Sequence, residues 1–249
     1  MTILEVDRLS HRFSDGYMGI REISLTLREG SFTVLAGPNG SGKTTFLRHL
    51  NGLLMPTAGD VRIKGVSVRE DPRRARRLVG MVFQDADSQI VGETVYDDAA
   101  FGPENLKLGR REIHRRVLAA LDAVGMSHLA GQRPHLLSGG EKRRLAIAGI
   151  LAMGSEVVVL DEPFSNLDYP GIRQVLGAIL DLHGQGRTIL LSTHDLEKTV
   201  AHADRLLLME KGRIAADGRP GAVLGQTERY GVRQPCAVRW GRAVESWLN

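Results

Sequence analysis

Residues 37–44 read Gly37-Pro38-Asn39-Gly40-Ser41-Gly42-Lys43-Thr44, and this stretch decides the fold of the chain. It fits the pattern G-x-x-x-x-G-K-[ST] at every fixed position. The apolar run 32–36 before it is typical of a buried strand, and residues 45–50 after it predict the first turns of a helix. Strand, glycine loop and helix in this order predict a phosphate-binding loop. The alternative, a glycine-rich turn that happens to contain a lysine, requires all these parts to coincide by chance.

Each part of this loop suits a polyphosphate. Glycines let the backbone wrap the phosphates with its N–H groups turned inward, and a helix N-terminus adds roughly half a positive elementary charge. We expect Lys43 to reach the β- and γ-phosphates, and the hydroxyl of Thr44 to bind Mg²⁺.

Size and composition are those of an ordinary globular protein. The 249 residues suffice for one large α/β domain or a core with a subdomain, and 42% of them are apolar and 25% charged. A formal net charge of +4 does not demand a nucleic acid partner. The one cysteine, Cys236, excludes a disulfide within the chain and favours a reducing compartment. No apolar run approaches the ~18 residues that span a bilayer, and no secretory signal is seen. We therefore expect a cytoplasmic protein that reaches a membrane only through a partner.

Three buried strands of the predicted core end at polar side chains. The run 78–83 ends at Gln84, the run 157–160 at Asp161 and Glu162, and the run 188–193 at His194. Ligands bind at the carboxyl ends of parallel strands, so these side chains are candidates for one site. Strand alternation should send Asp161 and Glu162 to different sides, one to hold Mg²⁺ and the other to polarise a water. The alternatives are a turn role for Gln84 and an ordinary role for His194.

Short alternating runs flank this core. Residues 3–6, 23–27 and 61–65 predict strands of a small antiparallel sheet, with a turn at Asp15-Gly16. The arginines of 69–77 are most simply a solvated helix face, and 204–209 with 212–214 predict a closing hairpin. Phe13 or Tyr17 could stack on an adenine ring, or could simply pack a surface turn.

Strand signals disappear between residues 85 and 137, which we interpret as an inserted helical subdomain. Gly102-Pro103 and Gly109 are expected to break the chain there, and 112–124 has helical periodicity. Ser138 predicts a helix N-cap, with Glu141 completing a capping box, and thus a second N-terminus that could bind an anion. A capping box also occurs without any function. A further helix is predicted over 172–182.

The fixed order of these features resembles that of the ATP-binding-cassette ATPases, over about residues 3–218. The most specific part is Leu137-Ser138-Gly139-Gly140, which separates this family from other P-loop proteins. The resemblance implies an α/β P-loop NTPase core with a mixed, mostly parallel sheet, a small antiparallel β subdomain and the inserted helical subdomain 85–137. These parts would form a nucleotide-binding domain over 1–218, and residues 219–249 would be an extension of unknown role.

The resemblance also implies ATP and Mg²⁺ as cofactors and a role for each matching residue. Phe13 would stack on adenine, a preference over Tyr17 that rests on the family pattern. Glu162 would be the general base or orient the water, and His194 would contact the γ-phosphate. The implied phosphate-binding residues are Gly37, Pro38, Asn39, Gly40, Ser41, Gly42, Lys43, Thr44 and Thr45. The implied metal ligands are Thr44, Gln84 and Asp161, and the catalytic residues Glu162, His194, Lys43 and Gln84.

The helix that begins at Leu137-Ser138-Gly139-Gly140 is called the signature helix below. In this family the phosphate loop and the signature helix of one subunit do not meet. Ser138, Gly139 and Gly140 would therefore cap the γ-phosphate of ATP bound to the opposite subunit. The resemblance thus implies a head-to-tail dimer closing on two ATP molecules, with an identical chain or a paralogue. Three positions depart from the family pattern, namely Glu141 for glutamine, Asn166 for the commoner alanine and Asp85 for the frequent asparagine. None of them removes a donor or a metal ligand.

A narrower match lies at Phe101-Gly102-Pro103-Glu104-Asn105, with Asp87-Ser88-Gln89 upstream. It is similar to the energy-coupling-factor ATPases, which drive uptake of cobalt, nickel or vitamins. The resemblance implies a peripheral subunit at the cytoplasmic face of the cell membrane, bound to an integral coupling protein and a substrate-binding membrane subunit. The coupling helix would press into the groove between Gln84 and the helical subdomain.

Two other classes of function are open from the sequence. A soluble cassette ATPase acting on nucleic acid or the ribosome is motivated by the arginines at 69–77 and 110–116. The sequence shows neither a long coiled-coil insertion nor a second cassette, which argues against this class. We therefore expect no nucleic acid partner. A regulatory nucleotide-binding protein without turnover is the other class, and the intact Glu162 and His194 argue against it.

Overall fold

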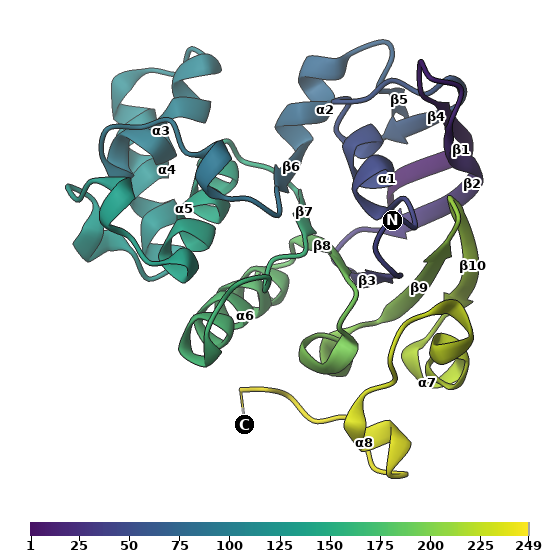
Figure 1. Cartoon of the computed structure of the whole chain (residues 1–249). Coiled ribbons are helices and arrows are strands. Elements are labelled where there is room, and N and C mark those ends of the chain that lie inside the picture. The colour runs from purple at the N-terminus through teal and green to yellow at the C-terminus, as the bar shows by residue number, and fades with distance from the viewer. Residues whose placement is uncertain (249) are drawn as a thin grey trace.

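The computed structural model describes residues 1–248, which form two sheets and their covering helices (Figure 1). The larger sheet has the strand order β10-β9-β3-β8-β7-β6. Its strands are β3 Phe32–Ala36, β6 Val79–Val82, β7 Val157–Asp161, β8 Thr188–Thr193, β9 Arg205–Glu210 and β10 Arg213–Gly218. Neighbours from β9 to β6 run parallel, and the edge strand β10 pairs antiparallel with β9 as the predicted hairpin. The predicted α/β core with a mixed, mostly parallel sheet is confirmed.

The parallel strands send alternate side chains into two cores. In β7, Val157 and Val159 belong to one core, and Val158 and Leu160 to the other. The first core also contains Phe46 of helix α1 (Lys43–Leu50) and lies under the second sheet. The other core is covered by α5 (Gly139–Ala152) and α6 (Tyr169–Gly184). Because both faces are buried, these strands are continuous apolar runs rather than alternating ones.

The second sheet is antiparallel, with the order β2-β1-β4-β5, which confirms the predicted small sheet. Its strands are β1 Thr2–Arg12, β2 Met18–Arg28, β4 Ala58–Ile63 and β5 Val66–Ser67. β1 and β2 are longer than predicted because irregular pairing after Val6 and Leu9 breaks the period of two. Lys64 and Gly65, predicted as strand, instead form a turn with φ of 47° and 77°.

Residues 85–137 hold two helices, α3 (Val95–Asn105) and α4 (Arg110–Ala123), with short 3₁₀ turns and no strand. α5 packs against both of them, and Figure 1 shows the three helices as a group beside the sheet. α4 and α6 confirm the two helices predicted over 112–124 and 172–182. α6 begins three residues earlier than predicted because the Asp168 carboxylate accepts from the Gly171 N–H and caps it.

The predicted break at Gly102-Pro103 is wrong, because both residues lie inside α3. Gly102 is packed against Met153 at the end of α5, where a Cβ on Gly102 would lie 2.3 Å from the Met153 Cγ. The glycine therefore permits close packing of two helices rather than a turn. The helix continues past Pro103 for only two residues.

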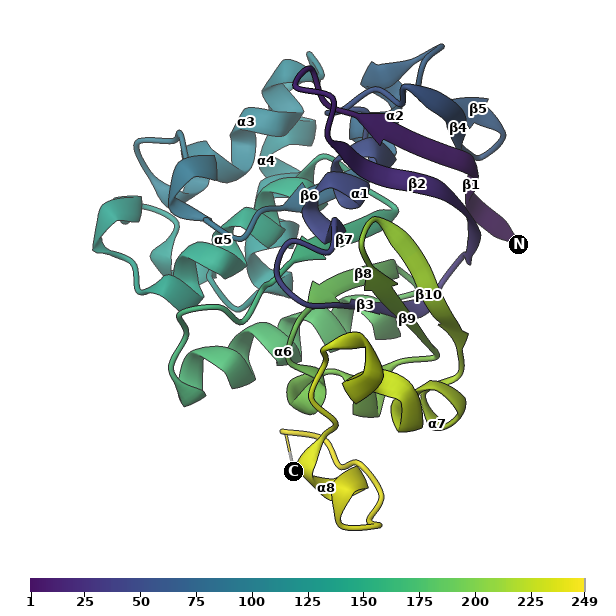
Figure 2. The same ribbon diagram turned by 45° about the vertical axis from the view of Figure 1, so that its right-hand side comes forward.

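The remaining helices are short. α2 (Pro72–Leu78) carries arginines and begins at the side-chain cap Asp71. Beyond β10 come α7 (Pro220–Val223) and α8 (Cys236–Arg239), which lie below the large sheet in the view of Figure 2.

Candidate functional site

The glycine loop joins β3 to α1 in the predicted strand–loop–helix order. Gly40 and Gly42 have φ of 77° and 106°, a region that side chains with a Cβ rarely adopt. A Cβ on Gly37 would lie 2.4 Å from the Met209 carbonyl oxygen. α1 begins at Lys43, two residues earlier than predicted, and no side chain caps it. The first N–H groups of the helix therefore have no intrahelical acceptor and are available to an anion.

A pocket of about 410 Å³ lies on this loop, lined by residues 39–45 together with Tyr17, Gly19, Gln84 and Glu162. The Ser41 hydroxyl is buried there and has no hydrogen-bond partner among the described residues. An unpartnered buried donor beside free helix N–H groups suits phosphate oxygens. Gln84, predicted to face the ligand from the end of β6, does line this pocket.

The Lys43 ammonium is buried at the loop. Its Nζ donates to the carbonyl oxygens of Gly37 at 2.7 Å and Pro38 at 3.3 Å, and lies 3.5 Å from Glu162 Oε1. The charge is therefore fixed at the base of the glycine loop, where it can attract a phosphate.

Asp161 ends β7 and contacts the loop directly. Its Oδ2 accepts from the Thr44 hydroxyl at 2.6 Å and its Oδ1 from the Ser192 hydroxyl at 2.5 Å. The carboxylate is buried, and no ion pair among residues 1–248 includes it. Mg²⁺ prefers oxygen ligands and binds few protein groups. The buried Asp161 carboxylate and the Thr44 hydroxyl fit this preference, and the Gln84 amide lines the same pocket as Thr44.

Glu162 follows the strand and lies between the Lys43 ammonium and the His194 ring. Besides Lys43, its Oε2 lies 3.0 Å from the His194 Nδ1. Its φ of 47° is unusual for a residue other than glycine, so the turn after β7, not strand alternation, sets its direction. Asp161 and Glu162 thus reach consecutive loop residues, Thr44 and Lys43.

Tyr17, rather than Phe13, lines the pocket, and 58% of Tyr17 is exposed. The Phe13 ring lies nearly parallel to Tyr17, with ring centroids 6.2 Å apart, and packs over Gly19. The adenine-stacking role of Phe13 stays a prediction, and this arrangement favours Tyr17 for the face toward the pocket.

Ser138 caps α5 as the sequence predicts. Its hydroxyl accepts from the Glu141 N–H, while its own N–H and O–H both donate to the Glu141 carboxylate at 2.8 Å. These bonds, first the one from the backbone and then the one from the hydroxyl, lower the pKa of Glu141. Ser138 is exposed, and none of Ser138, Gly139 and Gly140 lines the pocket on the glycine loop.

The signature glycines, Gly139 and Gly140, pack against the loop before α6 and against the first turn of α6. A Cβ on Gly139 would lie 3.3 Å from the Leu167 side chain, and one on Gly140 would lie 3.2 Å from the Gly171 Cα. Asn166 in that loop has φ of 61°, which asparagine tolerates better than alanine, so its departure from the family pattern has a local reason.

Sequence reasoning missed Ser192. It donates to Asp161, and its hydroxyl and carbonyl oxygens both accept from the Glu162 N–H, at 3.2 and 3.1 Å. A small polar residue near the end of an otherwise apolar strand was the available signal.

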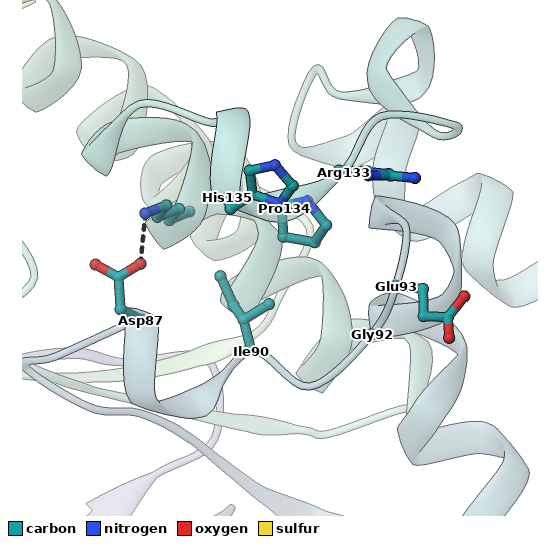
Figure 3. Close-up of a pocket in the computed structure, with 8 residues that line it drawn as sticks. Asp87, Ile90, Gly92, Glu93, Arg133, Pro134 and His135 are labelled. Carbon is teal, nitrogen blue, oxygen red and sulfur yellow. Dashed lines mark ion pairs between the residues drawn. The ribbon is translucent and has the colours of Figure 1, made fainter.

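A second pocket lies between the segment after β6 and the helical group (Figure 3). Ile90 and Pro134 supply apolar surface, and Asp87 pairs with Lys142 at 2.5 Å across one end. Asp87, Glu93, Arg133 and His135 place charged or polar groups around it. Among residues 1–248, no helix has the length and apolar character needed to cross a bilayer.

Comparison with known proteins identifies the family. The model of the ABC transporter family matches residues 20–165. The energy-coupling factor transporter ATP-binding protein EcfA of Methanocaldococcus jannaschii is 44% identical over 231 residues, covering 92% of this chain and 83% of its own length. The cobalt import ATP-binding protein CbiO of Rhodobacter capsulatus is 42% identical over 242 residues, 95% of this chain and 86% of its own. The solved structure of cbiO1 from Clostridium perfringens, described as part of the ABC transporter complex cbiONQ, superposes with a TM-score of 0.83 at 35% identity, covering 92% of each chain. The chain therefore belongs to the ABC transporter family.

Proposed function

We propose that this chain is the ATP-hydrolysing subunit of an energy-coupling-factor-type uptake transporter. The observation that carries the proposal is that Lys43 and Glu162 lie together at one glycine-loop pocket, with His194 in contact with Glu162. The relatives named EcfA and CbiO support the transporter class and disfavour the alternative of an ATPase acting on nucleic acid.

In this proposal the triphosphate lies on the glycine loop. The N–H groups at the start of α1 and the Lys43 ammonium bind its oxygens, and the Ser41 hydroxyl donates a further hydrogen bond. Tyr17 or Phe13 receives the adenine. Thr44, Gln84 and Asp161 would hold Mg²⁺, which when bound neutralises phosphate charge.

Hydrolysis is in-line attack of a water oxygen on the γ-phosphorus, with the bond to the β–γ bridging oxygen breaking and ADP leaving. The Glu162 carboxylate accepts a hydrogen bond from this water and takes its proton as the new P–O bond forms. His194 lies beside Glu162 and is half exposed, so its ring can also reach a γ-phosphate oxygen. Catalysis rests on positioning and charge stabilisation.

We further propose a head-to-tail dimer. The N-terminus of α5 is exposed and separate from the pocket of its own chain, so this helix end is accessible to the nucleotide of a second subunit. There the Ser138 hydroxyl would donate to the γ-phosphate in place of the Glu141 carboxylate. The second subunit is an identical chain or a paralogue.

The membrane partner is proposed to dock in the groove of Figure 3, at the cytoplasmic face of the membrane. Apolar Ile90 and Pro134 would receive a short amphipathic helix of an integral coupling subunit, with the surrounding charged side chains on its polar flank. A substrate-binding membrane subunit would select the cargo. Cobalt or nickel ions, or a vitamin, are the proposed cargo classes.

The test is Glu162→Gln. We expect the variant to bind MgATP and to dimerise but to hydrolyse ATP at least ~100-fold more slowly, because the proton acceptor is lost. Glu156→Gln is the matched control, since Glu156 precedes the opposite end of β7 and pairs with Lys64. Near-normal turnover of Glu162→Gln, measured by phosphate release, would remove Glu162 from the catalytic role.

A further inference from the structure

Arg143, on the second turn of α5, carries a buried charge that the proposed mechanism does not use. Only 4% of the residue is exposed, and no carboxylate of residues 1–248 lies within ion-pair distance of it. Its guanidinium instead donates to two consecutive main-chain carbonyls, those of Phe83 and Gln84, the second at 2.7 Å.

This burial is costly. Loss of hydration lowers the pKa of Arg143, partly offset by the more distant charges of Asp85, Asp161 and Asp87, and its Nε has no partner among the described residues. The guanidinium group is rigid and planar. Because it donates hydrogen bonds to two adjacent carbonyls, it fixes both the position and the direction of that backbone segment.

The segment so fixed is the one that carries Gln84. β6 ends at Val82, and Gln84 is the second residue beyond it, with its side chain at the nucleotide pocket. Gln89 also holds this strand end, since its amide oxygen accepts from the Phe83 N–H and its amide nitrogen donates to the Met81 carbonyl. Of Gln89 and Arg143, however, only Arg143 donates a hydrogen bond to the Gln84 carbonyl.

The same helix holds the next part of the segment. Lys142, adjacent to Arg143, pairs with Asp87 at 2.5 Å. Five residues before Arg143, α5 begins at the Ser138 cap. The first two turns of one helix therefore join the strand end beside the nucleotide pocket to the exposed N-terminus of that helix.

We propose that Arg143 is a positioning residue, which ties the backbone of Gln84 to the signature helix and thereby places the Gln84 amide for Mg²⁺. The proposal rests on the role proposed for Gln84. It predicts that movement of α5 and movement of Gln84 are linked through two hydrogen bonds.

The chain provides a matched control in Arg144. It lies on the same helix, is 9% exposed, and its guanidinium also donates to two main-chain carbonyls, those of Val124 and Gly125, as well as to the Gln174 side chain. None of these partners borders the nucleotide pocket. Arg144→Lys thus disturbs a buried arginine of equal kind without touching Gln84.

The experiment measures binding of ATP to the purified full-length protein, once with Mg²⁺ and once with EDTA. For Arg143→Lys we expect an unchanged dissociation constant in EDTA and a loss of roughly 10-fold in the tightening produced by Mg²⁺, as for other residues that orient a metal ligand. Hydrogen exchange at amides 83–90 should quicken several-fold in the same variant without any nucleotide. Arg144→Lys should leave both quantities unchanged.

Gln84→Ala separates failure of this inference from failure of the proposed site. If Gln84→Ala weakens the Mg²⁺ effect and Arg143→Lys does not, the positioning role is overturned. If neither weakens it, the role proposed for Gln84 fails, and Arg143 falls with it. A double variant should show no further loss beyond Gln84→Ala, because both act through one group. Arg143→Gln, which keeps an uncharged donor, replaces Arg143→Lys if the lysine variant does not fold.

Discussion

Charged side chains of the site contact one another, so substitution of one residue can leave its neighbour buried without a partner. Glu162 lies between Lys43 and His194, and Lys43 also has the Gly37 and Pro38 carbonyls. Removing the Glu162 charge therefore still leaves Lys43 with two acceptors. Removing Lys43 would leave Glu162 as a buried carboxylate with only His194. Glu162→Gln is thus the cleaner test of hydrolysis, because it changes chemistry more than folding.

His49, on α1 four residues after Thr45, links stability to pH. Its ring is fully buried, the Nδ1 pairs with the Thr45 carbonyl at 2.7 Å, and the Nε2 has no partner among residues 1–248. Burial lowers the pKa of His49 to about 4, with a smaller contribution from His11. The unfolded chain, with an ordinary pKa near 6.5, then binds more protons below neutrality, so stability is lost as the pH falls from 6.5 toward 4.

We expect the wild type to lose about 2 kcal/mol more unfolding free energy between pH 7 and pH 5 than His49→Phe loses. The phenylalanine keeps the ring contact with His11 but cannot take a proton. Urea unfolding at the two pH values measures the difference. The hydrogen bond to Thr45 is absent from His49→Phe at both pH values, so its loss cancels when the change between pH 7 and pH 5 is compared. An equal loss in the two proteins would show that His49 is not the titrating group.

Two helices of this protein begin with a complete capping box. Comparing them separates the contribution of Ser138 to helix stability from its proposed contact with nucleotide. Ser138 with Glu141 starts α5, and Thr94 with Asp97 starts α3, each as a complete capping box. We expect Ser138→Ala and Thr94→Ala each to cost about 1 kcal/mol of stability. ATP hydrolysis should fall steeply in Ser138→Ala alone, because only this helix end is proposed to contact the nucleotide of a second subunit.

Thermal unfolding and phosphate release of the two variants, measured side by side, check this prediction. Equal losses of activity would mean that Ser138 acts only through the stability of its helix.

Elements were predictable from the sequence where a periodic pattern met a clear end signal. β3, β8 and the cap of α5 have such signals, and their predicted bounds agree with the structure. The predicted break at Gly102-Pro103 was wrong because the sequence alone does not distinguish a glycine that allows two helices to pack closely from one that ends a helix. β1 and β2 were predicted too short because irregular pairing removes the alternation that identifies a strand.

The site was predictable to the same extent, for the same kind of reason. Residues that end strands, such as Asp161 and Glu162, stand out by their polarity after an apolar run. Arg143 does not, because its partner lies 60 residues away and nothing local marks it. Ser192 is marked only by its polarity near the end of an apolar strand, and its partner lies 31 residues away. The direction of Glu162 was not predictable either, since it depends on a left-handed φ beyond the strand.

At the scale of the whole molecule, the proposed dimer makes each catalytic site from two chains, and a mixing experiment tests that directly. Lys43→Met disables the glycine loop, and Ser138→Arg blocks the signature helix, so each variant alone should be inactive. In a mixed dimer, the loop of the Ser138→Arg chain meets the intact Ser138 of the Lys43→Met chain. One of the two sites is then complete.

Random pairing makes half of the dimers mixed, so we expect mixing equal amounts of the two variants to restore about a quarter of the wild-type rate if the sites act independently. Restoration should fall on dilution, because the active form requires association. A site complete within one chain would give no restoration at any ratio, since every chain in the mixture carries one defect. Phosphate release over a series of mixing ratios therefore distinguishes a shared site from a self-sufficient one, and a maximum at equal amounts is the result that only the head-to-tail arrangement gives.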